Sequence, residues 1–231
     1  MRVEIDDKSG FCFGVVRAID KAERALADYG TVYSLGDIVH NRIEVQRLEG
    51  LGLHTVTHAD LDGLGGRRLF IRAHGEPPST FARAREAGVE VIDATCPVVA
   101  KLQERVVKAH AEMAESGGQV VILGKRGHAE VVGLTGQVAA PTLVVEREED
   151  LAQVDFTRPV YFLSQTTQSI ALFERLALLK DGDLLLRAEL RQLIGRKNTA
   201  GTGTDDDYVI LHGVHPFEKI VLRNAARAFA A

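Results

Sequence analysis

Short apolar runs rich in β-branched residues alternate along the chain with longer stretches whose apolar positions recur every three or four residues. The first pattern is typical of buried strands and the second of amphipathic helices, so their alternation predicts an α/β fold with parallel sheets. In the first part of the chain we expect strands at five places: Val3–Ile5, Thr31–Leu35, Leu53–Val56, Arg68–Ile71 and Val89–Ile92.

Two helices are predicted between these strands. The first is expected to end at Gly30, a residue type that suits the left-handed C-cap position, and it carries its apolar side chains on one face at Val15, Ile19, Ala22 and Leu26. The second covers 77–87, with prolines in its first turn and Gly88 at its end. We expect this first unit to end near Cys96.

A second unit is expected from Pro97, whose ring suits the first turn of a helix that runs to about Glu115. Its strands are predicted at Val120–Leu123, Thr142–Val145 and Val160–Leu163, with short helices near Ala129–Gly136 and Ser169–Lys180. Beyond Lys180 the pattern weakens. There we expect a helix at Asp181–Leu193, a loop or disorder at Gly195–Asp207, a strand at Tyr208–Leu211 and a terminal helix at Glu218–Ala230.

Composition excludes several classes of protein. The chain has 231 residues, 45% of them hydrophobic and 26% charged, which rules out wholesale disorder. With a net charge of −4, no Trp and no basic run longer than Arg67-Arg68, we expect no nucleic-acid partner. Apolar runs are too short for a membrane span and the start does not resemble a signal peptide, so we expect no membrane partner and a cytoplasmic location.

Reactive polar side chains follow nearly every predicted strand, at Cys12, His40, His74, Cys96, His128, Glu130, Thr166 and Thr167. In open α/β sheets, ligands lie beyond the carboxyl ends of the strands, where helix N-termini offer unpaired amides. Each residue alone also has a structural interpretation: a buried thiol, a surface histidine, or a cap of the next helix. Their concurrence at the strand ends favours a functional site.

The residue types restrict the chemistry of such a site. Two cysteines on separate strand ends suit a soft metal or an iron–sulfur centre better than a redox pair, which would normally lie in one Cys-x-x-Cys turn. Histidines near helix N-termini suit a phosphate or diphosphate. Glu130 lies two residues from His128 and could donate a proton if burial raises its pKa. The H-E-x-x-H and G-x-G-x-x-G motifs are absent, which disfavours a zincin and a dinucleotide site.

Six short motifs occur in order: Gly10-Phe-Cys12-Phe-Gly-Val15, Val39-His40-Asn41, Arg72-Ala-His74-Gly75, Asp93-Ala-Thr-Cys96-Pro97, Gly127-His-Ala-Glu130-Val and Gln165-Thr-Thr167. With them, the chain resembles the LytB-type 4-hydroxy-3-methylbut-2-enyl diphosphate reductases over roughly residues 1–180. The resemblance implies a pseudo-threefold arrangement of small parallel-sheet α/β units around a central 4Fe-4S cluster. It also implies reductive removal of an allylic hydroxyl to give isopentenyl and dimethylallyl diphosphates, in non-mevalonate isoprenoid synthesis.

The resemblance also implies roles for individual residues. Cys12 and Cys96 would bind the cluster, and the diphosphate substrate would be surrounded by His40, His74 and His128. Glu130 would deliver the proton, while Thr166 or Thr167 would orient the substrate hydroxyl. Electrons would come from an external donor of the ferredoxin or flavodoxin type.

The chain departs from this family after about residue 180. The family's third cysteine and its Ser-x-Asn diphosphate motif lie in a third unit, but this sequence has no cysteine after Cys96. We therefore expect units at 1–96 and 97–180, with 181–231 a remnant of the third unit or a divergent tail left by truncation, deletion or a sequence shift, and impaired reductase activity. Two alternatives stay open: a non-catalytic diphosphate-binding protein, and a zinc-dependent hydrolase whose metal is held by both cysteines and a histidine.

Overall fold

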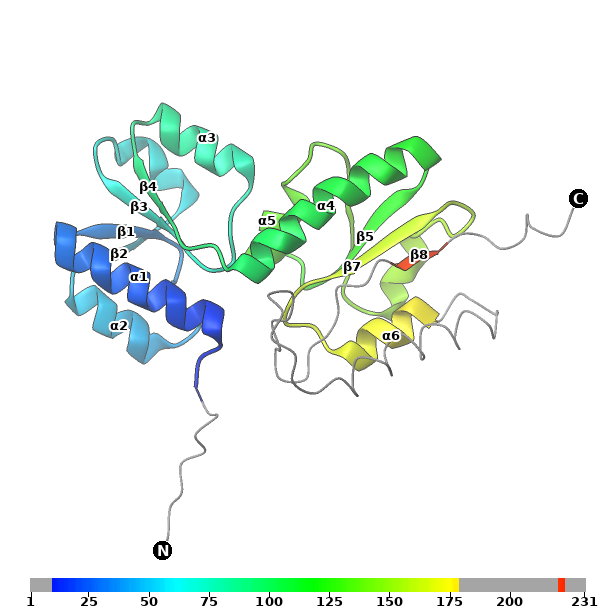
Figure 1. The fold of residues 1–231 in the computed structure, drawn as a ribbon, viewed down its shortest axis with the longest axis horizontal. Coiled ribbons are helices and arrows are strands. Elements are labelled where there is room, and N and C mark those ends of the chain that lie inside the picture. Colours follow the sequence, from blue (N-terminus) through cyan, green and yellow to red (C-terminus); the bar gives the residue numbers. More distant parts are fainter. Residues whose placement is uncertain (1–9, 179–219, 223–231) are drawn as a thin grey trace, which may run out of the picture. The chain divides into compact units, whose positions relative to one another are not determined.

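The computed structural model describes residues 10–178 and 220–222, which form two compact units (Figure 1). Unit 1 comprises Met1–Arg105 and Val132–Ala139, and unit 2 comprises Val106–Val131 and Ala140–Ala231. The boundary after Arg105 falls inside one long helix, α4 (Pro97–Ser116). Each unit contains a four-stranded sheet with helices between its strands, so the predicted α/β class is confirmed.

Unit 1 has an all-parallel sheet in the order β2-β1-β3-β4. Its strands are β1 (Val32–Leu35), β2 (Leu53–Val56), β3 (Arg68–Ile71) and β4 (Glu90–Asp93). Its further helices are α1 (Phe13–Tyr29), α2 (Arg42–Gly50), η1 (His58–Gly63) and α3 (Pro78–Glu86). The central strands β1 and β3 are almost wholly buried, which explains why they were predicted from continuous apolar runs. The strand order reverses between these two strands.

The helix ends of unit 1 follow from their capping residues. Gly30 ends α1 with φ +73°, and its N–H donates to the Leu26 carbonyl over 2.8 Å, as the sequence predicts. Helix α2 has no counterpart among the helices that the sequence predicts. Its signal is Asn41, whose side-chain oxygen accepts from the backbone N–H groups of Ile43 and Glu44.

Unit 2 has a sheet in the order β6-β5-β7-β8, in which only β8 runs antiparallel to its neighbour. Its strands are β5 (Gln119–Leu123), β6 (Leu143–Val145), β7 (Val160–Ser164) and β8 (Ile220–Leu222). Its further helices are η2 (Glu148–Gln153) and α6 (Ile170–Leu178), and α5 (Ala129–Thr135) begins in unit 2 and ends in unit 1. Phe162 of β7 stacks on Phe173 of α6 with ring centroids 4.8 Å apart, which anchors α6 in the core. The strand order reverses between β5 and β7.

The predicted terminal helix at Glu218–Ala230 is wrong where the structure describes it. Residues Ile220–Leu222 form β8, which pairs with β7. Three consecutive apolar residues, two of them β-branched, favour an extended edge strand over a helix. The other predictions at the two ends of the chain lie outside the described residues: Val3–Ile5, Asp181–Leu193, Gly195–Asp207 and Tyr208–Leu211.

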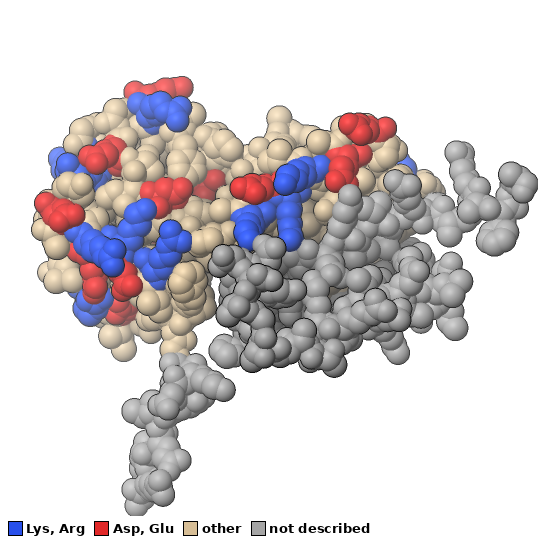
Figure 2. Space-filling model, viewed as in Figure 1, with Lys and Arg blue, Asp and Glu red and all other residues tan. Residues whose placement is uncertain are grey.

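The surface of unit 1 carries charges of both signs. Lys and Arg side chains alternate with Asp and Glu on the face shown in Figure 2. Arg47 illustrates the mixture, because one guanidinium nitrogen lies 2.6 Å from both Glu23 and Glu44. Such exposed pairs contribute only about 0–1 kcal/mol each, so the buried core dominates stability. Among the described helices, none is both long and apolar enough to cross a bilayer.

Candidate functional site

Apart from the two cysteines, the predicted site residues of each unit follow the two strands between which the strand order reverses. In unit 1, β1 leads to His40 and β3 leads to His74. In unit 2, β5 leads to His128 and Glu130, and β7 leads to Thr166. Ligands of open α/β sheets bind beyond the carboxyl ends of strands at this reversal, so the topology puts both groups where a ligand site is expected.

In unit 1, the loops after β1 and β3 hold two histidines and a partly buried cation. The rings of His40 and His74 are 5.3 Å apart between centroids. Arg72 reaches from the end of β3 to the loop after β1, where its guanidinium donates to the Asp37 carbonyl over 3.3 Å. It fits there because Gly36, at φ +75°, has no side chain; a Cβ at that position would lie 2.6 Å from a guanidinium nitrogen. Burial lowers the pKa of Arg72, but an arginine remains charged at neutral pH.

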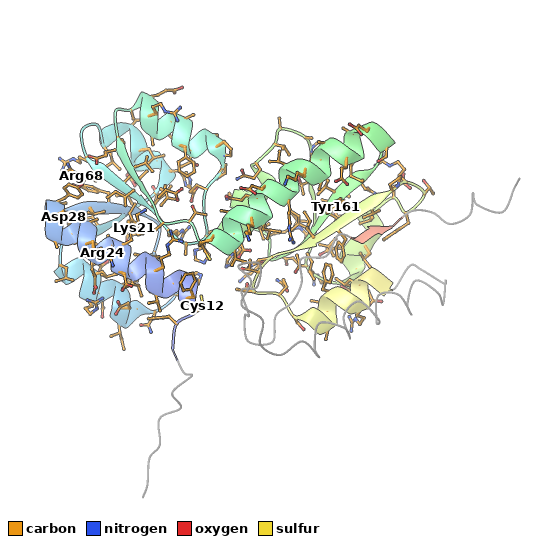
Figure 3. The ribbon with its side chains drawn as sticks, viewed as in Figure 1. Cys12, Lys21, Arg24, Asp28, Arg68 and Tyr161 are labelled. Atoms are coloured by element: carbon orange, nitrogen blue, oxygen red, sulfur yellow. The ribbon has the colours of Figure 1, made fainter. Side chains whose placement is uncertain are left out.

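The two cysteines of unit 1 approach the same helix end. Cys12 is exposed and precedes α1 as its N-cap, with no hydrogen bond from its side chain to the helix (Figure 3). Cys96 follows β4, and a Cβ added to Gly14 in the first turn of α1 would lie only 2.6 Å from its Sγ. The Cys96 thiol therefore lies against the helix turn that begins at Cys12. Cysteine sulfur is a ligand that soft metals prefer, so two cysteines beside one helix turn could hold such a metal.

In unit 2, a buried carboxyl group is held by one threonine. Glu130 is 1% exposed and stands in the first turn of α5. Its carboxylate accepts two hydrogen bonds of 2.7 Å, from the backbone N–H and the hydroxyl of Thr166. Burial raises the pKa of Glu130, and the Thr166 bonds offset part of this rise. A carboxyl group in this position can retain a proton at a pH where exposed carboxyls are ionised.

The neighbours of Glu130 are fixed by further hydrogen bonds. The Glu130 N–H donates to Nδ1 of His128 over 3.2 Å, so the neutral ring carries its proton on Nε2. Gln165 accepts from the Lys125 N–H over 3.0 Å and donates to the Thr167 hydroxyl over 2.8 Å. Gln165 thus joins the loops after β5 and β7. No role is predicted for Gln165 from the sequence, although it follows a predicted strand just as Thr166 does.

The structure brings some predicted residues together within each unit. In unit 1 it pairs His40 with His74 and sets Cys96 against the turn after Cys12. In unit 2 it joins Glu130 to Thr166 and to His128, whereas Thr167 is exposed and contacts Gln165 instead of Glu130. Thr166 is therefore the threonine that can act together with the carboxyl group. The functional roles of all these residues stay predictions.

The two α/β units carry thiols, histidines and a buried carboxyl group in the loops beyond their strands. These are residue types with which a class of α/β proteins binds metals and anions. The comparison with known families narrows this class. The family model described as "LytB protein" matches residues 3–183, which is most of the chain. The chain belongs to the LytB family.

Two relatives among curated proteins carry the name 4-hydroxy-3-methylbut-2-enyl diphosphate reductase. The protein from Parabacteroides distasonis is 53% identical over 174 residues, which cover 75% of this chain and 60% of the relative. The protein from Porphyromonas gingivalis is 51% identical over 172 residues, covering 74% of this chain and 60% of the relative. The chain therefore spans about 60% of the length of these relatives.

Two solved structures of diphosphate reductases are also similar to this chain. The E-1-hydroxy-2-methyl-but-2-enyl-4-diphosphate reductase of Plasmodium falciparum superposes with a TM-score of 0.64 at 27% identity, covering 82% of this chain and 56% of that structure. A second structure, described as (E)-4-hydroxy-3-methyl-but-2-enyl diphosphate reductase, the terminal enzyme of the non-mevalonate pathway, also has a TM-score of 0.64. It is 36% identical and covers 74% of this chain and 60% of that structure.

Proposed function

We propose that this chain binds 4-hydroxy-3-methylbut-2-enyl diphosphate and carries residues for its reductive dehydroxylation, the activity for which its relatives are named. The reaction breaks an allylic C–O bond and consumes two electrons and two protons. One proton leaves with the hydroxyl as water, and the other is added to the carbon skeleton. The observation that carries this proposal is the buried Glu130 carboxyl bonded to Thr166, because the reaction needs a proton held away from bulk water.

Glu130 is the proton donor in this proposal. Its burial favours the neutral carboxylic acid, which can transfer a proton to the departing hydroxyl. Thr166 holds the donor through its backbone and its hydroxyl, so the carboxyl keeps one orientation before and after proton transfer. The same hydroxyl is the group nearest Glu130 that can orient a substrate oxygen.

His40, His74 and Arg72 form the anion-binding part of unit 1 in this proposal. A diphosphate carries several negative charges, and the Arg72 guanidinium provides a fixed positive charge between the loops after β1 and β3. The imidazoles of His40 and His74 provide N–H donors, and in unit 2 His128 offers the same kind of donor on its Nε2.

Cys12 and Cys96 fit two ligand positions of a 4Fe-4S cluster. Cys12 is the N-cap of α1, and the thiol of Cys96 lies against the first turn of the same helix. The sequence has two cysteines, so any further ligand must be another kind of group. When bound, the cluster supplies electrons and polarises the substrate hydroxyl. We further propose an external donor of the ferredoxin or flavodoxin type, and a cytoplasmic location, where thiols stay reduced.

The proposal is tested by diphosphate binding, followed as thermal stabilisation of the full chain. Because diphosphate binds the native state, saturating inorganic diphosphate should raise both the Tm and the free energy of unfolding. At 100 times Kd the free energy of unfolding should increase by about 2.7 kcal/mol. His74→Ala should remove most of this shift. The matched control is His54→Ala near the start of β2, whose ring lies 5.5 Å from that of Tyr33 between centroids, and it should retain the shift. A wild-type protein with no shift would overturn the proposal.

A further inference from the structure

The loop from Arg72 to Pro77, between β3 and α3, carries His74 and contains a buried carboxylate two residues later. The side chain of Glu76 is only 4% exposed. Burying a carboxylate is unfavourable unless hydrogen bonds replace the lost water. A glutamate in this place therefore depends on its partners, and those partners determine where the loop lies.

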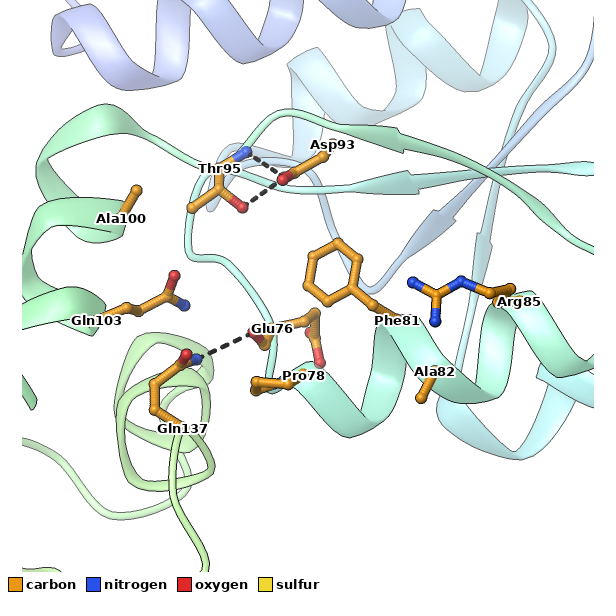
Figure 4. Close-up of a pocket in the computed structure, with 10 residues that line it drawn as sticks. All are labelled: Glu76, Pro78, Phe81, Ala82, Arg85, Asp93, Thr95, Ala100, Gln103 and Gln137. Carbon is orange, nitrogen blue, oxygen red and sulfur yellow. Dashed lines mark hydrogen bonds between the residues drawn. The ribbon is translucent and has the colours of Figure 1, made fainter. Parts of the chain in front are cut away.

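The partners of Glu76 come from separate elements. Its Oε2 lies 2.9 Å from Nε2 of His58 in η1 and accepts from the Thr80 hydroxyl in α3 over 3.2 Å. Its backbone carbonyl accepts from Gln137 Nε2 over 3.3 Å, and the same amide nitrogen donates to Gly133 over 2.7 Å (Figure 4). Glu76 thus ties the loop to η1, to α3 and to the 132–139 segment of unit 1.

The backbone before Glu76 is also closely confined. Gly75 has φ +69°, and a Cβ there would lie 2.6 Å from Nε2 of Gln103 in α4. On another side, a Cβ at Gly133 would come within 3.4 Å of the carbonyl oxygens of Gly75 and His74. The turn therefore has little freedom between His74 and Glu76, so a displacement of Glu76 is transmitted to the histidine.

Packing alone does not hold Glu76. A cavity of about 450 Å³ lies beside it, with Phe81, Gln103 and Gln137 among its other lining residues (Figure 4). The cavity leaves space beside the Glu76 side chain, so packing contributes less to holding this side chain than it does in a filled core. The hydrogen bonds of Glu76 to His58 and Thr80 are consequently the contacts that fix its side chain.

We propose that Glu76 is a positioning residue of the diphosphate site, which fixes His74 through the Gly75 turn. This inference rests on the proposed function, because it assigns a task to the loop that carries one of the proposed anion-binding histidines. Removal of the carboxylate releases the loop from η1 and α3. His74 then loses its fixed orientation toward the anion, although it is itself unchanged.

The experiment compares Glu76→Leu, Glu76→Gln and a control in the full chain. The control is Glu90→Gln, which removes an exposed carboxylate paired with Arg68 at the start of β4, away from the strand ends. Two quantities are measured: Kd for inorganic diphosphate by calorimetry, and the ¹⁵N resonances of the His74 ring. Glu76→Leu should raise Kd about tenfold, equivalent to about 1.4 kcal/mol, and move the His74 resonances. Glu76→Gln should restore most of the affinity because its amide oxygen can accept both bonds, and Glu90→Gln should match the wild type.

The outcomes separate this inference from simpler explanations. If Glu76→Leu lowers Tm but leaves both Kd and the His74 resonances unchanged, Glu76 is only structural and the inference is overturned. If that variant does not fold, Thr80→Val removes one bond and should change both quantities in the same direction, to a smaller extent; no change would overturn the inference. If wild-type protein does not bind diphosphate, the proposed function fails, and the His74 resonances in Glu76→Leu still decide whether Glu76 positions this ring.

Discussion

Units 1 and 2 share the same strand order but place different chemistry beyond their strands, and only the sheet of unit 2 has an antiparallel edge strand. In unit 1 the loops after β1 and β3 hold a pair of histidines and a partly buried arginine, and Cys96 follows β4. In unit 2 they hold a carboxyl group that is 1% exposed and bonded to one threonine. The scaffold determines where groups converge, while local burial determines what they can do. Unit 1 offers thiols, imidazoles and a positive charge, and unit 2 offers a carboxyl group whose pKa is raised by burial.

The largest expected effect concerns turnover, which tests whether the two thiols of unit 1 suffice for the reaction. Iron–sulfur clusters are ordinarily held by four thiolates, whereas this sequence has two cysteines, so a cluster bound here would have iron sites without a thiolate ligand. We expect the reconstituted 231-residue chain, assayed anaerobically with the hydroxylated diphosphate and a strong one-electron donor, to turn over at least tenfold below the common kcat range of ~1–10³ s⁻¹. Turnover within that range would show that the ligand groups of unit 1 are sufficient.

A smaller effect is expected from Gly14→Ala, which tests the close approach of Cys96 to α1. The new Cβ would lie 2.6 Å from Sγ, so the helix or the thiol must move. Overpacking of this kind typically destabilises a protein by about 1–3 kcal/mol. Urea unfolding should show this loss. The matched control is Gly50→Ala in α2, where a Cβ meets nothing within 4 Å, and it should leave stability unchanged or raise it. Equal effects of both substitutions would contradict the packing of Cys96 on α1.

The smallest effect is a pH dependence that belongs to unit 2. Burial raises the pKa of Glu130 in the native state above its ordinary value of 4.5, so the native state retains a proton that the unfolded state has lost. Above pH 4.5 this contribution to stability therefore falls as the pH rises, until the native-state pKa is passed. The free energy of unfolding of Glu130→Gln should be measured together with that of wild type from pH 4 to 8. The value of the variant should increase relative to the wild-type value as pH rises, because the variant has no carboxyl group to lose its proton. A difference that does not vary with pH would contradict the raised pKa.

The strands were the part of the fold that the sequence predicted best. Strands β3 and β7 are buried along almost their whole length, so their apolar runs stand out from the flanking residues. Helix α2 was missed because only Val45 and Leu48 are buried in it, and Ile43 is 79% exposed. The error at Ile220–Leu222 has a different cause, because an apolar triplet forms a strand only when a neighbouring edge is available for pairing.

For the candidate site, sequence reasoning found the positions but not the partners. That Glu130 and Thr166 follow predicted strands is visible in the sequence; that they bond across 36 residues depends on β5 lying next to β7. Glu76 shows the same limit, since its bond to His58 joins η1 to the loop after β3. A one-dimensional pattern gives the order of strands along the chain, whereas the order within the sheet decides which loops meet.

The most direct test of the central claim is the visible spectrum of the anaerobically purified full chain, together with its iron and sulfide content. If the strand ends of unit 1 bind an iron–sulfur cluster, the protein will be brown, with broad absorbance near ~400 nm and about equal amounts of iron and sulfide. Cys12→Ser and Cys96→Ser should each abolish this absorbance, because each removes one of the two thiolates that the chain supplies. A colourless wild-type protein without iron and sulfide, or one that contains zinc instead, would contradict the account.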